Sequence, residues 1–249
     1  MQIQRDDGRT ILSMREWRAM VIGSERGIVA NYLDGLQELA YTWCMGGSAG
    51  VPDEVAALLR SKMPTATVVR VVASPRLVEA ATASGCEADL LVEIRDRDAT
   101  LVALVVPISA VARGQIIAHT SGMDPLCLSL FGRPVTGGGR VDPTLGELSS
   151  LLVSAASAAI AQAAATGAAG AMVIIHEIVT PVTNRDELTI GRAHVEAFAR
   201  ALGLDSASAG SLAGPAALPL GPLDDDSRPR MPFWLGLATR QLPALAWID

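Results

Sequence analysis

The chain has 249 residues, of which 50% are hydrophobic, 4% aromatic and 18% charged, and its mean hydropathy is +0.34. A chain of this length can bury a core, but its two most apolar stretches, 101–112 and 151–169, do not suit a membrane span, because the first is short and the second is mostly alanine. The formal net charge of −6 and the pI of about 5.1 argue against a broad nucleic-acid-binding face, which needs clustered cations.

The first 65 residues predict a helical N-terminal part. Apolar side chains recur along 29–43 at the spacing of one helix face. A glycine-rich run ends that helix, and Pro52 suits the first turn of another helix that continues to about Arg60.

From residue 66 the pattern changes to strands. Residues 67–72 are rich in β-branched side chains, and a short helix is expected over 76–84. Two apolar runs, 89–94 and 100–106, flank a short polar turn and predict a β-hairpin. The second run has almost no polar alternation, which indicates a central strand buried on both faces, and Pro107 ends it.

A long segment rich in glycine and proline follows the hairpin. Residues 112–143 are expected to be irregular, and a loop of this length in a compact domain is usually functional or mobile. An alanine-dense helix is then expected over 145–166, and a buried strand over 171–176. The small side chains of the helix suit either burial within the chain or the packing of a second copy, so a homo-oligomer is one expected state.

The last part of the chain predicts a helix and two closing strands. The helix covers 186–202, with Ile190 among its expected buried positions, and the strands lie near 218–223 and 233–237. We therefore expect one α/β domain over the whole chain, with a mixed central sheet and helices on both faces. Its core is 66–203, and 204–249 form a closing segment.

The cysteines and the start of the chain bear on the compartment. Three widely spaced cysteines, Cys44, Cys86 and Cys127, form no Cys-x-x-Cys pair and predict buried free thiols. The polar start of the sequence lacks the pattern of a signal peptide. These features favour a cytoplasmic protein without a membrane segment.

The order of hairpin, helix and strand resembles the common core of restriction-endonuclease-like proteins, the PD-(D/E)XK group, and more narrowly a poorly characterised bacterial family with that core. The matching segments are 32–43, 51–59, 154–163 and 171–176, with Asp89 at the start of the hairpin. In that group, the Asp that opens the hairpin and the Glu of a Glu-x-Lys on the second strand bind a divalent cation, and the lysine assists hydrolysis. Asp89 matches the first position. The second strand instead ends Val106-Pro107-Ile108-Ser109, and the only lysine, Lys62, lies elsewhere, so the resemblance implies a degenerate catalytic motif.

Other acidic residues are candidates for a relocated metal site. Glu93 follows Asp89 by four positions and therefore points to the same face of the strand. Glu147 lies on a neighbouring predicted helix. Asp89, Glu93 and Glu147 are thus candidate ligands of Mg²⁺, the cofactor that a nuclease of this group would need.

A polar pair closes the buried strand over 171–176. His176 and Glu177 stand where α/β sheets often hold active groups, and histidine can act as an acid or a base near neutral pH. Asp89, His176 and Glu177 are therefore the candidate catalytic residues, with His119 of the long segment as a further member of the cluster.

Three functions remain open. The first is a non-catalytic restriction-endonuclease-like scaffold that binds a protein partner or itself, which rests on the missing Glu-x-Lys and the acidic pI. The second is a metal-dependent nuclease with relocated acidic ligands, although the charge does not favour nucleic acid as a partner. The third is a small-molecule enzyme that uses His176 and Glu177, with the long segment as a lid.

Overall fold

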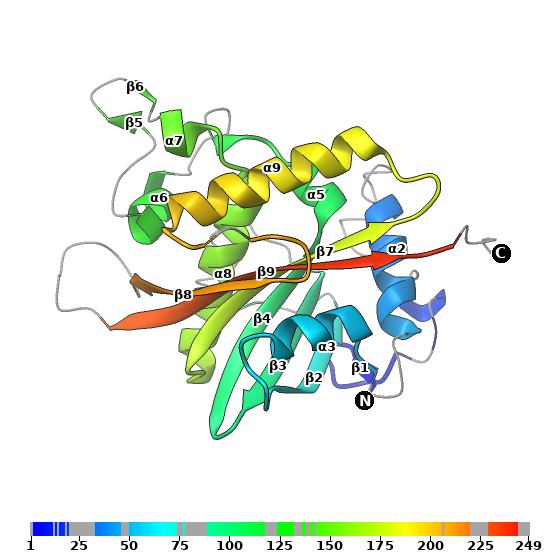
Figure 1. Ribbon diagram of the computed structural model, residues 1–249. Coiled ribbons are helices and arrows are strands. Elements are labelled where there is room, and N and C mark those ends of the chain that lie inside the picture. Colours follow the sequence, from blue (N-terminus) through cyan, green and yellow to red (C-terminus); the bar gives the residue numbers. More distant parts are fainter. Residues whose placement is uncertain are drawn as a thin grey trace.

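The structure is a computed structural model of the chain, shown in Figure 1. It describes residues 2–11, 13, 15–17, 19, 33–45, 50–73, 77, 89–117, 124–131, 136–137, 140–141, 143–205, 207–219 and 229–243. The expected helix over 76–84, apart from residue 77, lies outside these residues, as do His119 and Cys86.

A seven-stranded mixed sheet forms the centre of the molecule. In spatial order its strands are β1 (Ile3–Gln4), β2 (Thr67–Ala73), β3 (Leu90–Asp96), β4 (Ala99–Pro107), β7 (Gly170–Val179), β9 (Arg230–Gln241) and β8 (Leu212–Pro219). The β2–β3, β3–β4 and β8–β9 pairs are antiparallel, whereas β1–β2, β4–β7 and β7–β9 are parallel. The strands β4, β7 and β9 therefore finish together, and we call this side of the molecule the carboxyl end of the sheet.

Helices cover both faces of the sheet (Figure 1). One face carries α2 (Leu33–Cys44) and α3 (Asp53–Arg60), and the other carries α5 (Ile108–Arg113), α6 (Asp124–Phe131), α8 (Ser150–Thr166) and α9 (Arg185–Ala201). The short α7 (Pro143–Gly146) precedes α8, and a two-stranded ribbon of β5 (Thr136–Gly137) and β6 (Arg140–Val141) lies apart from the sheet. The predicted α/β class, with a mixed sheet between helices, is confirmed.

The sheet has a hydrophobic core on each face, because successive side chains of a strand point to opposite faces. In β7, Val173 and Ile175 belong to the core under α8 and α9, while Met172 and Ile174 belong to the core under α2 and α3. The strands β4 and β7 are buried along almost their whole length. Their continuous apolar sequences predict this central place.

The small side chains of α8 pack inside the chain. Its buried positions are Leu152, Val153, Ser154, Ala155, Ala156, Ala158, Ala159, Ile160 and Ala163. They lie against β4, β7 and the helices α5, α6 and α9. Burial within the chain, one of the two interpretations of this helix, accounts for these buried positions.

Three parts of the fold differ from the expectation. The N-terminal part also supplies a strand, since Ile3 of β1 pairs with Val71. The segment 112–143 is not wholly irregular, because it contains α6, whose eight residues are too few for a clear periodic pattern. The penultimate strand begins at Leu212, earlier than expected. Its glycine and prolines are unusual in a strand and argue against one in the sequence, but an edge strand of a sheet tolerates them.

One expected core position is also wrong. Ile190 is 47% exposed, whereas Val195 and Phe198 of the same helix are buried. The stripe of α9 that faces the sheet is thus narrower than the sequence pattern suggests.

Candidate functional site

The candidate catalytic residues Asp89, His176 and Glu177 all lie at the carboxyl end of the sheet. Pro107 of β4 lies beside His176 of β7, and Ile178 lies beside Arg240 of β9. Leu90 pairs with Val105, so Asp89 stands next to the end of β4. The side chain of Asp89 is buried at this place.

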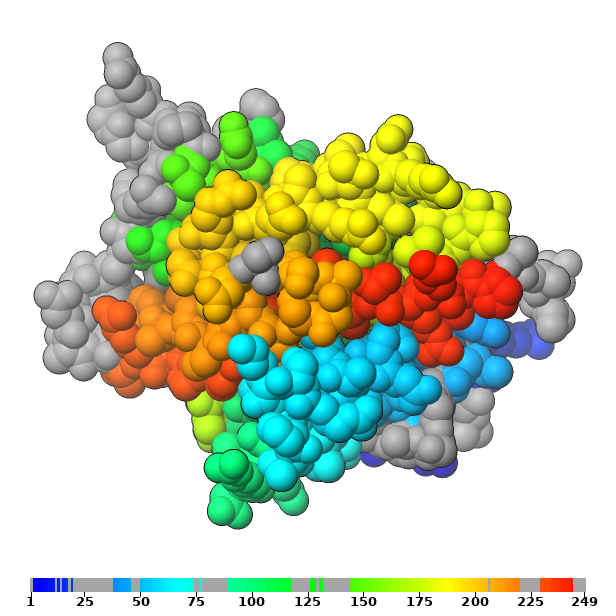
Figure 2. Space-filling view, viewed as in Figure 1, coloured from blue at the N-terminus to red at the C-terminus, as the bar shows by residue number. Residues whose placement is uncertain are grey.

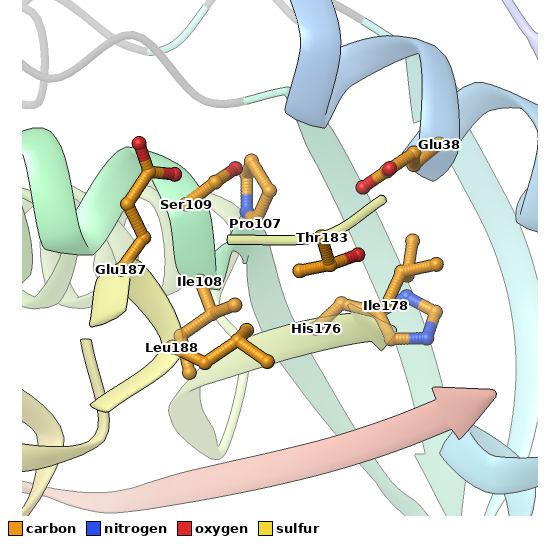
Figure 3. A pocket seen from close by; sticks show the side chains of 9 residues that line it. All are labelled: Glu38, Pro107, Ile108, Ser109, His176, Ile178, Thr183, Glu187 and Leu188. Atoms are coloured by element: carbon orange, nitrogen blue, oxygen red, sulfur yellow. The ribbon is translucent and has the colours of Figure 1, made fainter. Parts of the chain in front are cut away.

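A small pocket opens between the ends of β4 and β7 (Figure 3). Its lining comes from four parts of the chain: Glu38; Pro107, Ile108 and Ser109; His176 and Ile178; and Thr183, Glu187 and Leu188. The space open to the centre of a water molecule is about 20 Å³. Since one water needs roughly 10–15 Å³ on this measure, the pocket has room for about one.

Both ring nitrogens of the buried His176 are engaged. The indole Nε1 of Trp43 in α2 donates to its Nδ1 at 3.1 Å, and its Nε2 lies 2.9 Å from Oε1 of Glu54 in α3. Because Nδ1 accepts, the proton of the neutral ring sits on Nε2 and is donated to the Glu54 carboxylate. His176 therefore links β7 to both helices of that face, and neither nitrogen is left for a substrate.

The surroundings favour a neutral imidazole beside an ionised carboxylate. Burial lowers the pKa of His176 and outweighs the opposing effect of Glu54. Burial alone would raise the pKa of Glu54, but the hydrogen bond from His176, its own backbone amide and the nearby charge of Arg240 bring that pKa below its usual value. A guanidinium nitrogen of Arg240 lies 3.6 Å from Oε2 of Glu54.

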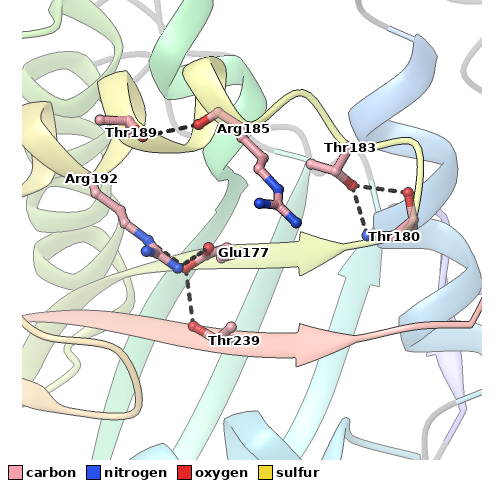
Figure 4. A network of polar contacts seen from close by, with 7 residues as sticks. All are labelled: Glu177, Thr180, Thr183, Arg185, Thr189, Arg192 and Thr239. Carbon is pink, nitrogen blue, oxygen red and sulfur yellow. Dashed lines mark hydrogen bonds and ion pairs between the residues drawn. The ribbon is translucent and has the colours of Figure 1, made fainter.

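Glu177 has a separate set of partners on the other face (Figure 4). Arg192 of α9 donates to both of its carboxylate oxygens, at 3.2 and 2.5 Å, and Thr239 of β9 donates its hydroxyl at 3.1 Å. The carboxylate is fully buried, whereas the Arg192 side chain is 50% exposed. This bidentate contact fixes α9 over β7 and β9.

The two adjacent polar residues do not form one catalytic pair. Successive side chains of a strand point to opposite faces, so His176 lies toward α2 and α3 and Glu177 toward α9. The structure gives each its own structural contacts. Within the described ranges, neither of them shares with Asp89 a group of three side chains that could hold a metal ion.

The candidate metal ligands are also apart. Asp89 and Glu93 share a face of the strand, but four residues span roughly 13 Å, too far for one ion whose ligands lie about 2–2.6 Å away. Glu93 instead accepts from Arg70 of β2 at 3.0 Å, and Glu147 is exposed in the turn before α8. Among the residues that the structure describes, no group of three His, Cys, Asp or Glu side chains could hold a metal ion.

The end of β4 offers no substitute for the missing Glu-x-Lys. Val105, Val106 and Ile108 are buried there. Lys62 is exposed in the connection from α3 to β2, close to Thr65, whose hydroxyl donates to Asp96 at the turn of the hairpin. That turn lies at the opposite end of β3 from Asp89, so Lys62 cannot serve the site.

Two cysteines of the described chain are free. Cys127 is buried, and burial raises the pKa of the Cys44 thiol to about 11. Cys127 thus confirms the expected buried free thiol, whereas Cys44 is free but only half-buried.

The partners of the site residues were not identified from sequence. In the sequence, Glu54 has the ordinary place of an acidic residue in the first turn of a helix, and Trp43 that of a core residue. The available signal was the polar pair at the end of a buried strand, because each buried polar group needs a partner.

Comparison of the chain with protein-family models, with curated proteins and with solved structures finds no match. None of the helices in the described part of the chain is long and apolar enough to cross a bilayer.

Proposed function

We propose that this chain is a non-catalytic scaffold with a restriction-endonuclease-like core, and that it acts as a protein-interaction module. The order of its elements supports the assignment of the core: α2 and α3, then β2, the β3–β4 hairpin, α8, and β7 parallel to β4. This is the arrangement on which the resemblance depends.

One observation carries the proposal. Every polar atom of His176 and Glu177 that chemistry would need is already held by another side chain: Trp43, Glu54, Arg192 or Thr239. A general base must reach the proton that it removes, whereas both ring nitrogens of His176 are engaged and the Glu177 carboxylate is fully buried in its contact with Arg192. The strongest candidates at the carboxyl end of the sheet thus support the architecture rather than a reaction.

A metal-dependent nuclease is the second candidate, because Asp89 is buried beside the end of β4. It is less favoured, since no group of three His, Cys, Asp or Glu side chains among the described residues could hold the metal ion. A small-molecule enzyme is less favoured still, because the pocket beside His176 has room for about one water molecule.

The test is an assay of the purified chain with single- and double-stranded DNA and RNA, in the presence of Mg²⁺ or Mn²⁺. We expect no cleavage and no rise in the midpoint of thermal unfolding when either metal is added. Cleavage that Asp89→Asn abolishes and Glu196→Gln preserves would overturn the proposal. Glu196 is a suitable control because it is an exposed acid of α9 and belongs to none of the candidate sites.

A further inference from the structure

Among the residues that the structure describes, no strand pairs with the last part of β9 on its outer side. The pairing of β8 with β9 ends at Leu212 and Gly236, and the preceding turn adds two hydrogen bonds to Leu237. On the inner side, β7 pairs with β9 as far as Gln241. Figure 2 shows this part of β9 (red) as a strip on the surface between α9 (yellow) and α3 (cyan).

The backbone of this strip offers hydrogen-bonding groups to the outside. Leu237 bonds to the turn before β8, whereas Leu242 donates to Val179 of β7, so odd positions face outward and even positions face inward. The N–H and C=O groups of Thr239 and Gln241 therefore point outward. Neither residue has a backbone partner on that side in the described part of the chain. We call 239–241 the open edge of β9.

Guanidinium groups border the open edge. In the pair Arg192–Glu177 the side chains are 50% and 0% exposed, and in Arg240–Glu54 they are 28% and 15% exposed. Each pair thus turns its cation outward and its carboxylate inward. Arg185, near the start of α9, also extends toward the sheet (Figure 4). Within the described ranges its side chain forms no ion pair.

We propose that the open edge of β9 binds an extended acidic peptide segment of a protein partner as an added strand. Main-chain hydrogen bonds to Thr239 and Gln241 would supply the pairing, and the three guanidinium groups would select acidic side chains on the added strand. This inference rests on the proposed function and names the surface and the partner chemistry of that module.

The charges favour a different protein over a second copy. Antiparallel pairing of two open edges would place the two copies of α9 on the same face, side by side, about a two-fold axis. The cations of one copy, Arg185 and Arg192, would then face those of the other. An acidic strand replaces this repulsion by attraction.

The outer side of β8 is a poorer docking edge. The strand contains Pro215 and Pro219, which have no N–H group, and its pairing with β9 is irregular between Ala213 and Ala216. Prolines and bulges of this kind prevent the addition of a strand. No proline interrupts 239–241, so the open edge keeps its donors.

The experiment selects random displayed peptides on the full chain and measures the enriched peptides by fluorescence polarisation. We expect acidic sequences rich in β-branched residues. Gln241→Pro should weaken their binding roughly tenfold, because it removes an outward N–H and leaves the inner ladder intact, whereas Gln241→Ala should not. Arg185→Gln should weaken binding about fivefold, and the same change at the exposed Arg200 of α9 should not.

Amide hydrogen exchange supplies a second measurement. Bound peptide should slow the exchange of Thr239 and Gln241 relative to the inward-facing Arg240. Failure to enrich peptides, or binding that Gln241→Pro leaves unchanged, would overturn this inference. If the chain also showed no nuclease activity, the proposed function would still stand. A dimer dissociated by Gln241→Pro would also overturn it, by making a second copy the occupant. Nuclease activity together with peptide binding at the open edge would overturn the proposed function alone.

Discussion

The imidazole of His176 connects three elements that are far apart in the chain. It accepts from Trp43, 133 positions away, and donates to Glu54, 122 positions away. Of the described charged groups, Glu38 of α2 and Glu187 of α9 line the pocket beside it, and Arg240 of β9 approaches Glu54. If Nδ1 were protonated, its N–H would point at the indole N–H of Trp43 and no hydrogen bond could form. The contact with Trp43 therefore requires the neutral ring.

Acid should therefore destabilise the fold through His176. The pKa of this residue is lowered in the folded state, so as the pH falls through about 6.5 the unfolded chain takes up a proton that the folded chain does not. The free energy of unfolding, measured by urea titration, should be highest near about pH 7.5 and decrease toward about pH 5. Glu54, whose pKa is also lowered, should add a further loss below about pH 4.5.

A pair of histidine variants assigns the effect. His176→Gln should lower stability at neutral pH and flatten its decrease between about pH 7 and about pH 5. His194→Gln, in a half-buried position of α9, should leave that decrease in place. An unchanged slope in His176→Gln would show that the loss has another origin.

Glu177 gives a second prediction for a single side chain. Arg192→Met would leave a fully buried carboxylate with Thr239 as its remaining described side-chain partner. We expect the free energy of unfolding to fall by about 1–3 kcal/mol, a range that allows for the half-exposed position of the arginine. The measurement is urea denaturation at neutral pH.

Two further variants test the cause. Adding Glu177→Gln to Arg192→Met should recover part of the loss, because the buried charge is then gone. Arg200→Met, at an exposed position of the same helix, should change stability by less than about 0.5 kcal/mol. Equal losses at Arg192 and Arg200 would contradict a specific role of the Glu177 contact.

Among the elements, α9 packs directly against α5 at Gly191. A Cβ atom at this position would lie 2.6 Å from Cγ1 and 3.0 Å from the carbonyl oxygen of Ile108. The glycine thus lets α9 lie directly on α5, beside the carboxyl end of the sheet. This close approach helps to hold Arg192 over Glu177.

Gly191→Ala should consequently destabilise the protein. Alanine normally gains about 1 kcal/mol over glycine within a helix, but the overlap with Ile108 should cost more, so we expect a net loss of about 1–2 kcal/mol. Ala193→Gly, at an exposed position two residues later, should lose about 1 kcal/mol from helix propensity alone. Denaturant midpoints with unchanged m-values check both, and a stabilised Gly191→Ala would contradict the close packing.

For the whole molecule, the apolar runs of the sequence predict the hairpin, the central strands and the helices on both faces. They do so because a strand buried on both sides has no room for polar residues, as β4 and β7 illustrate. The site was less predictable. Its contacts join residues more than 100 positions apart, and even Glu177 and Arg192, which are close in sequence, meet only through the rotation of α9 over the sheet.

The adjacent positions of His176 and Glu177 have a consequence for how the chain tolerates change. Inserting or deleting one residue at the start of β7 would turn the imidazole toward Arg192 and the carboxylate toward Trp43, and would exchange the apolar side chains of this strand between the two cores. Either substitution alone damages one layer, whereas such a frame change damages both. Length variation in homologous chains should therefore fall outside this strand.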